Sequence, residues 1–383
     1  MVGHQLKTLT LVTGGLSRPD LGSLIEMETT DRHPRVVFFA DALNTDELDE
    51  KFLQRAPPWR RFFYKMLPIT AAQVIEALII RNKYDAVISW AEKLGLPLAI
   101  LMKITGSRVP HIGLFGWPAI GNKGRLLKHF HHQFDRIIMW STVQRDKVIR
   151  ELGVPASKIV LIKWPVDQQF FRPMPRSTDM ICAVGSEMRD YPTLIEAMRG
   201  LPFTCHVAAG TLIKKNTRWE KAVQDKRDLP PNVTVGRKSP LEIRELYARS
   251  RFVVIPLHPT ETDNGITCIL EAFAMGKPVI CSRTRGQVDV IEEGRTGIFV
   301  PVGDSKALSQ AIAELWNNPD RAEEMGKNAR AYIEQYATLD RFVARVREIV
   351  EDCVSDYPTD RHTPASARLS SQKTAARSET TSS

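Results

Sequence analysis

The chain has 383 residues, of which 43% are hydrophobic and 25% are charged, and its formal net charge is +9. These values are ordinary for a soluble globular protein, the length is enough for two domains with full cores, and no apolar run approaches the roughly 20 residues of a membrane helix. The positive charge suits a phosphorylated ligand, an anionic membrane surface or nucleic acid, without deciding among them.

The cysteines and the N-terminus point to a reducing compartment. The five cysteines are scattered and form no CxxC motif, which also argues against a metal knuckle. Met1–Gly15 lacks the apolar core and the small-residue cleavage site of a signal peptide. We therefore expect a cytoplasmic protein.

The first half of the chain alternates between strand and helix patterns. The predicted strands are Leu6–Thr13, Arg35–Ala40, Tyr84–Ser89, Val109–Phe115, Arg136–Met139 and Ile159–Ile162. The predicted helices are Ile69–Arg81, Leu94–Lys103, Lys123–Phe134 and Thr142–Leu152. This alternation predicts an α/β fold with a doubly wound, mostly parallel sheet. Gly14 and Gly15 follow the first strand, where sugar-binding domains often carry glycines, although simple turn glycines are commoner there.

A break in the pattern predicts two domains. Trp164–Arg176 carries three prolines and no periodicity, and we place a linker at 166–176. Strand and helix patterns then restart. The expected organisation is a first domain over 1–165, a second over 177–338, a helix over 339–354 that could cross back to the first domain, and a disordered tail over 355–383.

The stretch from Pro256 to Ile280 contains the strongest candidate site. A short strand and a polar loop precede a predicted helix that begins at Ile266. Asp263 stands just before this helix, and Glu271 points away from its apolar stripe. Free N–H groups at a helix start can bind phosphate, and carboxylates can bind hydroxyls, so the stretch suits a polyol phosphate. On their own, Asp263 would be read as an N-cap and Glu271 as part of a solvated helix face.

Several motifs follow one another in a familiar order. They are a V-D-x-x-x-F-x-P segment at Val166–Pro173, a glycine turn with a basic residue and a helix at Ala183–Ala197, the segment NVTVGRKSPLEIRELYARSRFVVIPL, an acid-x7-Glu motif from Asp263 to Glu271, and GRTGIFVPVGD. From about Asp135 to Phe342 the chain resembles the retaining glycosyltransferases of family 4. The resemblance implies the GT-B fold, in which two Rossmann-like domains face a central cleft.

The resemblance also implies a donor site in the second domain. Glu271 matches the glutamate that binds ribose hydroxyls, and Asp263 stands where a sugar-binding glutamate is expected, with Glu261 as the alternative carboxylate. Arg189 stands at the family's phosphate-binding lysine, although beside Asp190 it could also form a surface ion pair. Arg189, Asp263 and Glu271 are the implied catalytic residues. The other implied donor contacts are Ser186, which replaces an arginine of the family, Val235, Gly236, Arg237 and Lys238 near the base, and Asn264, Gly265, Ile266 and Thr267 near the diphosphate.

The implied reaction moves a sugar from a nucleotide sugar, a UDP- or GDP-sugar, to an unknown acceptor with retention of configuration. A helix N-terminus and a guanidinium would stabilise the leaving diphosphate, and no DxD motif stands in a suitable loop, so we expect neither a metal nor another cofactor. Two alternatives stay open. One is a nucleotide-sugar epimerase or hydrolase on the same fold, and the other is a non-catalytic nucleotide-sugar-binding protein.

Candidates in the first domain follow two predicted strands. Trp90 and Glu92 follow one, and Gly116 and Trp117 stand where many relatives carry a histidine. With Gly14 and Gly15 they are the expected cleft residues, although such loops also simply cap a core. His111 is interpreted as a satisfied strand residue.

Two basic, aromatic segments complete the first domain. Lys51–Lys65 suits either a peripheral contact with an anionic membrane at the inner face or an ordinary solvated surface, and for Lys123–His132 the solvated surface is favoured. No nucleic-acid-binding motif is present, and we expect no nucleic-acid partner.

Overall fold

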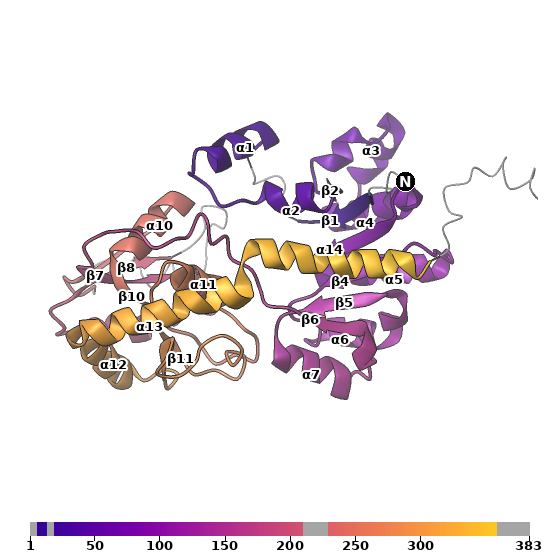
Figure 1. The fold of residues 1–383 in the computed structure, drawn as a ribbon. Coiled ribbons are helices and arrows are strands. Elements are labelled where there is room, and N and C mark those ends of the chain that lie inside the picture. The colour runs from indigo at the N-terminus through magenta and orange to yellow at the C-terminus, as the bar shows by residue number, and fades with distance from the viewer. Residues whose placement is uncertain (1–5, 14–18, 210–228, 358–383) are drawn as a thin grey trace, which may run out of the picture.

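The computed structural model describes residues 6–13, 19–209 and 229–357, which form two lobes (Figure 1). Each lobe contains a six-stranded parallel sheet, with the strand orders β2-β1-β3-β4-β5-β6 and β12-β11-β10-β7-β8-β9. The predicted fold class, two doubly wound α/β domains, is confirmed. Gly14, Gly15 and the predicted tail from residue 358 on lie outside the described residues, and the predicted start of that tail at 355 is wrong, because Ser355 is the last residue of a helix.

The first lobe holds the strands up to Leu161. They are β1 (Thr8–Leu11), β2 (Thr45–Leu48), β3 (Ala86–Trp90), β4 (His111–Leu114), β5 (Arg136–Met139) and β6 (Ile159–Leu161). The helices between them are α1 (Leu21–Thr29), α2 (Val37–Ala42), α3 (Pro58–Tyr64), α4 (Ile69–Ile80), α5 (Glu92–Ile104), α6 (Asn122–Phe130) and α7 (Thr142–Arg150).

The second lobe begins with the strand at Met180. Its strands are β7 (Met180–Val184), β8 (Thr204–Ala208), β9 (Val233–Gly236), β10 (Ser250–Ile255), β11 (Val279–Ser282) and β12 (Gly297–Val300). Its helices are α8 (Tyr191–Met198), α10 (Pro240–Arg249), α11 (Ile266–Ala274), α12 (Ser305–Asn317) and α13 (Pro319–Tyr332). The central strand β10 is buried along almost its whole length, as expected for a strand covered on both faces.

The strand predicted at Arg35–Ala40 is wrong. Val37–Ala42 forms the helix α2, and the second strand of the lobe is Thr45–Leu48. A short apolar run does not distinguish a strand from a buried helix, and here Phe39 packs edge-on against Trp90 with ring centroids 4.7 Å apart. The true strand, TDEL, lies at the edge of the sheet and carries mainly polar side chains, so it has no apolar signal.

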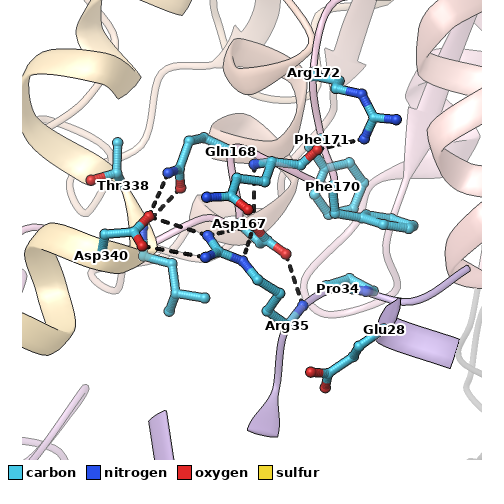
Figure 2. A network of polar contacts seen from close by, with 12 residues as sticks. Glu28, Pro34, Arg35, Asp167, Gln168, Phe170, Phe171, Arg172, Thr338 and Asp340 are labelled. Carbon is cyan, nitrogen blue, oxygen red and sulfur yellow. Dashed lines mark hydrogen bonds and ion pairs between the residues drawn. The ribbon is translucent and has the colours of Figure 1, made fainter. Parts of the chain in front are cut away.

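The chain passes twice between the lobes, and the two passages are hydrogen-bonded to each other. Val166 N donates to Ala337 O at 3.0 Å, and Leu339 N donates to Val166 O at 3.0 Å. Arg35 of the first lobe holds both passages, because its Nε donates to Asp167 Oδ1 at 3.0 Å and its Nη2 to Asp340 Oδ2 at 3.2 Å (Figure 2).

The last helix returns to the first lobe. The helix α14 (Leu339–Ser355) begins at the second passage and runs along the first sheet, as the yellow ribbon in Figure 1 shows. Phe342, Val346 and Ile349 share a core cluster with Ile88 and Ile112 of β3 and β4. The C-terminal helix therefore adds to the core of the first lobe.

Candidate functional site

The start of α11 is built on a glycine. Gly265 occupies the N-cap with a left-handed φ of 93°, and a Cβ at this position would lie 3.0 Å from Ile255 Cγ2. Ile266 N donates to Asp263 O at 3.1 Å, so the predicted phosphate contact from this amide is already used within the loop. Thr267 is exposed in the first turn, where amides have no partner within the helix. This end of α11 can still offer N–H groups to an anion.

Arg189 lies buried between the glycine turn after β7 and the start of α11. Its Nε donates to Val184 O at 3.1 Å, its Nη1 to Glu187 O at 2.8 Å, and its Nη2 to Cys268 Sγ at 3.4 Å. A Cβ at Gly185 would lie only 2.6 Å from Nη2, so only a glycine leaves room for this guanidinium. The turn and the helix therefore hold the positive charge in place.

The charge of Arg189 has no carboxylate counterpart in the described part of the chain. The alternative of a surface ion pair with Asp190 is wrong, because Asp190 instead caps α8 by accepting a hydrogen bond from Thr193 N. A buried guanidinium with only neutral partners is well suited to an anionic ligand.

Glu271 is half-buried on α11 and does not lie on a solvated helix face. Tyr247 of α10 donates its hydroxyl to Glu271 Oε2 at 2.9 Å. Burial raises the pKa of Glu271 to about 7, although Tyr247 and the nearby Arg189 act in the opposite direction. The carboxylate is thus fixed by one hydrogen bond while it keeps capacity to accept others.

Asp263 is 3% exposed and joins the two lobes. Trp117 of the first lobe donates its indole N–H to Asp263 Oδ1 at 2.7 Å, while Oδ2 is buried with no hydrogen-bond partner among the described residues. Burial raises the pKa of Asp263, and the bond from Trp117 partly offsets this. The N-cap interpretation is wrong, because Gly265 occupies the N-cap and no side chain caps the helix.

The loop that carries Trp117 is held by Glu92, the first residue of α5. Trp117 N donates to Glu92 Oε1 at 2.7 Å, and Lys123 Nζ lies 3.4 Å from Glu92 Oε2. At Gly116 a Cβ would lie 2.8 Å from Trp140 Cζ2, so the loop passes close to this indole. Glu92, Gly116 and Trp117 are therefore brought to the start of α11.

Other predicted site residues have different surroundings. Trp90 packs edge-on against Phe39 and Trp164 in the core of the first lobe. His111 is buried in β4, where its Nε2 lies 2.8 Å from Ser89 Oγ, and burial lowers its pKa to about 3. An imidazole whose charged form is so strongly disfavoured suits a buried position in the core.

The two neighbours of Asp263 in the loop are already engaged. Glu261 is exposed and pairs with Lys147 and, at 3.5 Å, with Arg285. Asn264 Oδ1 accepts hydrogen bonds from the hydroxyls of Thr260 and Thr262. Asp263 is thus the loop carboxylate with a buried oxygen that accepts no hydrogen bond from the residues the structure describes.

Most of the predicted base contacts lie at the edge strand β9, which β7 and β8 separate from β10, the strand before α11. Val235 and Gly236 end the edge strand β9, and Lys238 lies 3.8 Å from Glu242. Ser186 is half-buried in the glycine turn, and Arg237 has an interaction partner. Among the described residues, the side-chain hydrogen bonds of Arg189 and Glu271 go to Val184, Glu187, Cys268 and Tyr247, and none of them goes to this group.

The sequence patterns did not reveal two residues whose side chains contact the predicted site residues Glu271 and Arg189. Tyr247 orients Glu271 across 24 positions of the chain, and Cys268 contacts Arg189 across 79. Neither shows a local pattern, since each reaches its partner only through the packing of α10, α11 and the turn after β7. Within the described ranges, no group of three or more His, Cys, Asp or Glu side chains is arranged to hold a metal ion.

Two family models match the chain. The model described as "Glycosyl transferases group 1" matches residues 180–332, and the one described as "Glycosyltransferase Family 4" matches residues 28–170. Each match lies in one lobe, and together they span most of the chain. The site around α11 falls within the first match.

Curated relatives match over part of their length. The D-inositol 3-phosphate glycosyltransferase of Gordonia bronchialis is 32% identical over 137 residues, which are 34% of this chain and 27% of the relative. The D-rhamnosyltransferase WbpZ of Pseudomonas aeruginosa is 31% identical over 150 residues, which are 39% of this chain and 35% of the relative. The alignments thus span about a third or less of these relatives.

Solved structures share the fold along nearly the whole chain. A glycosyltransferase from Rickettsia africae superposes with a TM-score of 0.70 at 18% identity, over 92% of this chain and 100% of that one. The Anabaena protein HepE, in complex with UDP-glucose, gives a TM-score of 0.65 at 17% identity, over 92% and 100% of the two chains. At such identities the likeness shows the fold.

Proposed function

We propose that this chain, which belongs to the group 1 glycosyltransferases, transfers a sugar from a nucleotide sugar to an acceptor hydroxyl. The observation that carries the proposal is the placement of Arg189. Its buried guanidinium lies between Gly185 and Gly265, at the start of α11. A fixed cation beside a helix N-terminus favours a diphosphate.

In this proposal the donor spans the start of α11. The diphosphate lies against Arg189 and the amides of the first turn, beginning at Thr267. Glu271, oriented by Tyr247, accepts hydrogen bonds from the ribose hydroxyls. A UDP- or GDP-sugar fits these contacts, and the UDP and UDP-glucose named for the HepE structures favour the first.

The sugar lies next to Asp263. Its Oδ2 is a buried acceptor that no other described residue satisfies, and such atoms are rare in proteins unless a ligand or water completes them. A sugar hydroxyl donating to this oxygen would satisfy it. Trp117 holds the other carboxylate oxygen, so the first lobe takes part in positioning the sugar.

We propose a retaining, metal-independent reaction. As the bond to the diphosphate breaks, negative charge grows on the leaving phosphate, and Arg189 and the α11 amides stabilise it electrostatically. The acceptor attacks the same face of the sugar, and its proton passes to the departing phosphate. No separate base is then required.

We also propose a cytoplasmic location with a peripheral membrane contact through Lys51–Lys65. Among the helices of the described ranges, none is sufficiently long and apolar to cross a bilayer.

A thermal-shift panel of UDP-, GDP- and ADP-sugars tests the donor assignment. One sugar nucleotide should raise the melting temperature of the wild type, because a ligand that binds only the folded state stabilises it. Glu271→Ala should lose this shift, whereas Glu323→Ala, an exposed glutamate on α13, should keep it. If no sugar nucleotide stabilises the wild type, the assignment fails. Product analysis with and without an added acceptor then separates transfer from hydrolysis.

A further inference from the structure

Helix α3 exposes several large apolar side chains. Trp59 is 63% exposed, Phe62 65%, Phe63 56% and Met66, just after the helix, 73%. Tyr64 on the same helix points inward and donates its hydroxyl to the buried Glu76 at 2.6 Å. Tyr64 thus attaches α3 to the core of the lobe, while Trp59, Phe62 and Phe63 remain exposed to solvent. Contiguous exposed apolar side chains usually mark a binding surface.

Positive charge surrounds these apolar side chains. The segment Lys51–Lys65 contains five basic residues and no acidic one. Arg61 and Lys65 are exposed, and neither forms an ion pair with another described residue. Arg60 differs, because it turns inward to Glu76 at 3.4 Å. The surface formed by Trp59, Arg61, Phe62, Phe63, Lys65 and Met66, here called the α3 face, is therefore both apolar and cationic.

The α3 face lies at the same edge of the first sheet as the candidate site. The segment that carries it follows the carboxyl end of β2 at Leu48. It leads into α4, where Gln73 donates to the carbonyls of Val12 and Leu48 at 2.7 and 3.0 Å. The chain is thus tied to the carboxyl ends of β1 and β2 both before the segment, at Leu48, and after it, at Gln73. Trp117 stands beyond the carboxyl end of β4, and the strands are parallel.

We propose that the α3 face docks on an anionic bilayer. Trp59, Phe62, Phe63 and Met66 enter the boundary between headgroups and acyl chains, while Arg61 and Lys65 bind the anionic headgroups. Aromatic and cationic side chains together, without an acidic residue, match this chemistry. Docking brings the carboxyl edge of the first sheet toward the membrane, and in the proposed function this edge carries Trp117, which helps to position the sugar.

Vesicle co-sedimentation of the full chain tests the proposal. The wild type should sediment with vesicles of phosphatidylcholine and phosphatidylglycerol, and far less with phosphatidylcholine alone. The double variants Phe62→Ser/Phe63→Ser and Arg61→Glu/Lys65→Glu should each lose binding by about tenfold or more. The matched control Ile79→Ser/Ile104→Ser removes two side chains that are 47% and 74% exposed elsewhere, and it should bind as the wild type does.

Three outcomes would overturn the docking. The first is that the wild type does not sediment with anionic vesicles. The second is that the control variant loses vesicle binding as much as the double variants do. The third is that Phe62→Ser/Phe63→Ser changes the oligomeric state while vesicle binding stays unchanged. The last outcome would show that the face contacts a second copy of the chain. Folding of each variant is checked by its unfolding temperature. Sedimentation needs no donor, so a failed donor panel would remove the proposed transfer and leave the docking untouched.

Discussion

The indole N–H of Trp117 donates a 2.7 Å hydrogen bond to Asp263 Oδ1, across 146 positions of the chain. Trp117 belongs to the first lobe and Asp263 to the second, and the bond exists only while the lobes lie together. It fixes one oxygen of a buried carboxylate, while the other has no hydrogen-bond partner in the described part of the chain. The orientation of this carboxylate therefore depends on how the lobes meet.

Replacing Trp117 by Phe should lower kcat/KM for transfer by about tenfold to a hundredfold, since hydrogen bonds to charged groups contribute about 1.5–3 kcal/mol. The same replacement in the background of Asp263→Asn should cost much less, because the two residues act through one contact. Steady-state kinetics of the double-mutant cycle measure this difference. Trp316→Phe, on α12 and stacked against Phe203, serves as the control. Equal effects of Trp117→Phe in both backgrounds would exclude the coupling.

Glu271 should make stability depend on pH. Its pKa rises from the ordinary 4.5 to about 7 in the folded protein, with burial as the main cause. Between these values the unfolded chain has released a proton that the folded protein still holds, so the free energy of unfolding falls as pH rises through this window. Glu271→Gln cannot ionise and should gain stability over the wild type from pH 5 to pH 8, by on the order of 1 kcal/mol.

Urea unfolding of both proteins at pH 5 and pH 8 provides the measurement. Glu323→Gln is the matched control, because Lys327 holds the pKa of this exposed glutamate below its ordinary value. A difference between wild type and Glu271→Gln that stays constant with pH would contradict the prediction.

Arg189→Lys should weaken the binding of a nucleoside diphosphate by about tenfold or more. Lysine keeps the charge, but it lacks the planar guanidinium that donates to Val184 O and Glu187 O while facing the start of α11. Binding of the nucleoside without phosphates should change little, and calorimetry with both ligands compares the two. Arg199→Lys, at the exposed end of α8, controls for the substitution. Equal losses for both ligands would indicate a disturbed fold instead.

Arg35→Met should reduce the free energy of unfolding by about 2–3 kcal/mol, because Asp167 is buried and would lose its charged partner. Guanidinium unfolding measures the loss, and Arg249→Met, which breaks an exposed pair with Asp179, should cost under about 1 kcal/mol. An equally small effect of Arg35→Met would show that the passages between the lobes do not depend on the contacts of Arg35 with Asp167 and Asp340, here called the Arg35 clamp.

From the Arg35 clamp we also expect the protein to lose stability in acid. Burial acts to raise the pKa of Asp340, but hydrogen bonds from Arg35 and Gln168 outweigh it and hold the pKa below the ordinary 3.8. The stabilisation by Asp340 is therefore complete above the ordinary pKa and is lost as pH falls below it. In Arg35→Met this acid dependence should shrink, which unfolding at pH 3 and pH 6 would detect.

Local patterns in the sequence predict most of the elements and fail where an element has no pattern of its own. The alternation of apolar runs and helical periods predicts both sheets, and Gly265 with Glu271 marks the helix of the candidate site. Phe39 lies in an apolar run that fits a strand as well as a helix. In the tertiary structure the run is a helix, in which Phe39 packs against Trp90 and Phe342. The polar edge strand Thr45–Leu48 gives no apolar signal at all.

The sequence by itself determined the α/β class, the break near residues 166–176 and, in the second half, a helix that carries Glu271 and follows Asp263. Each depends on residues close together in the chain, whose periodicity and turn chemistry are local properties. Only the tertiary structure decided that Arg189 is buried with neutral partners among the described residues, that Tyr247 holds Glu271, and that Trp117 reaches Asp263. These contacts join residues from different elements and, for the last, different lobes. Their burial and hydrogen bonds come from the packing of the sheets and helices, which no local pattern encodes.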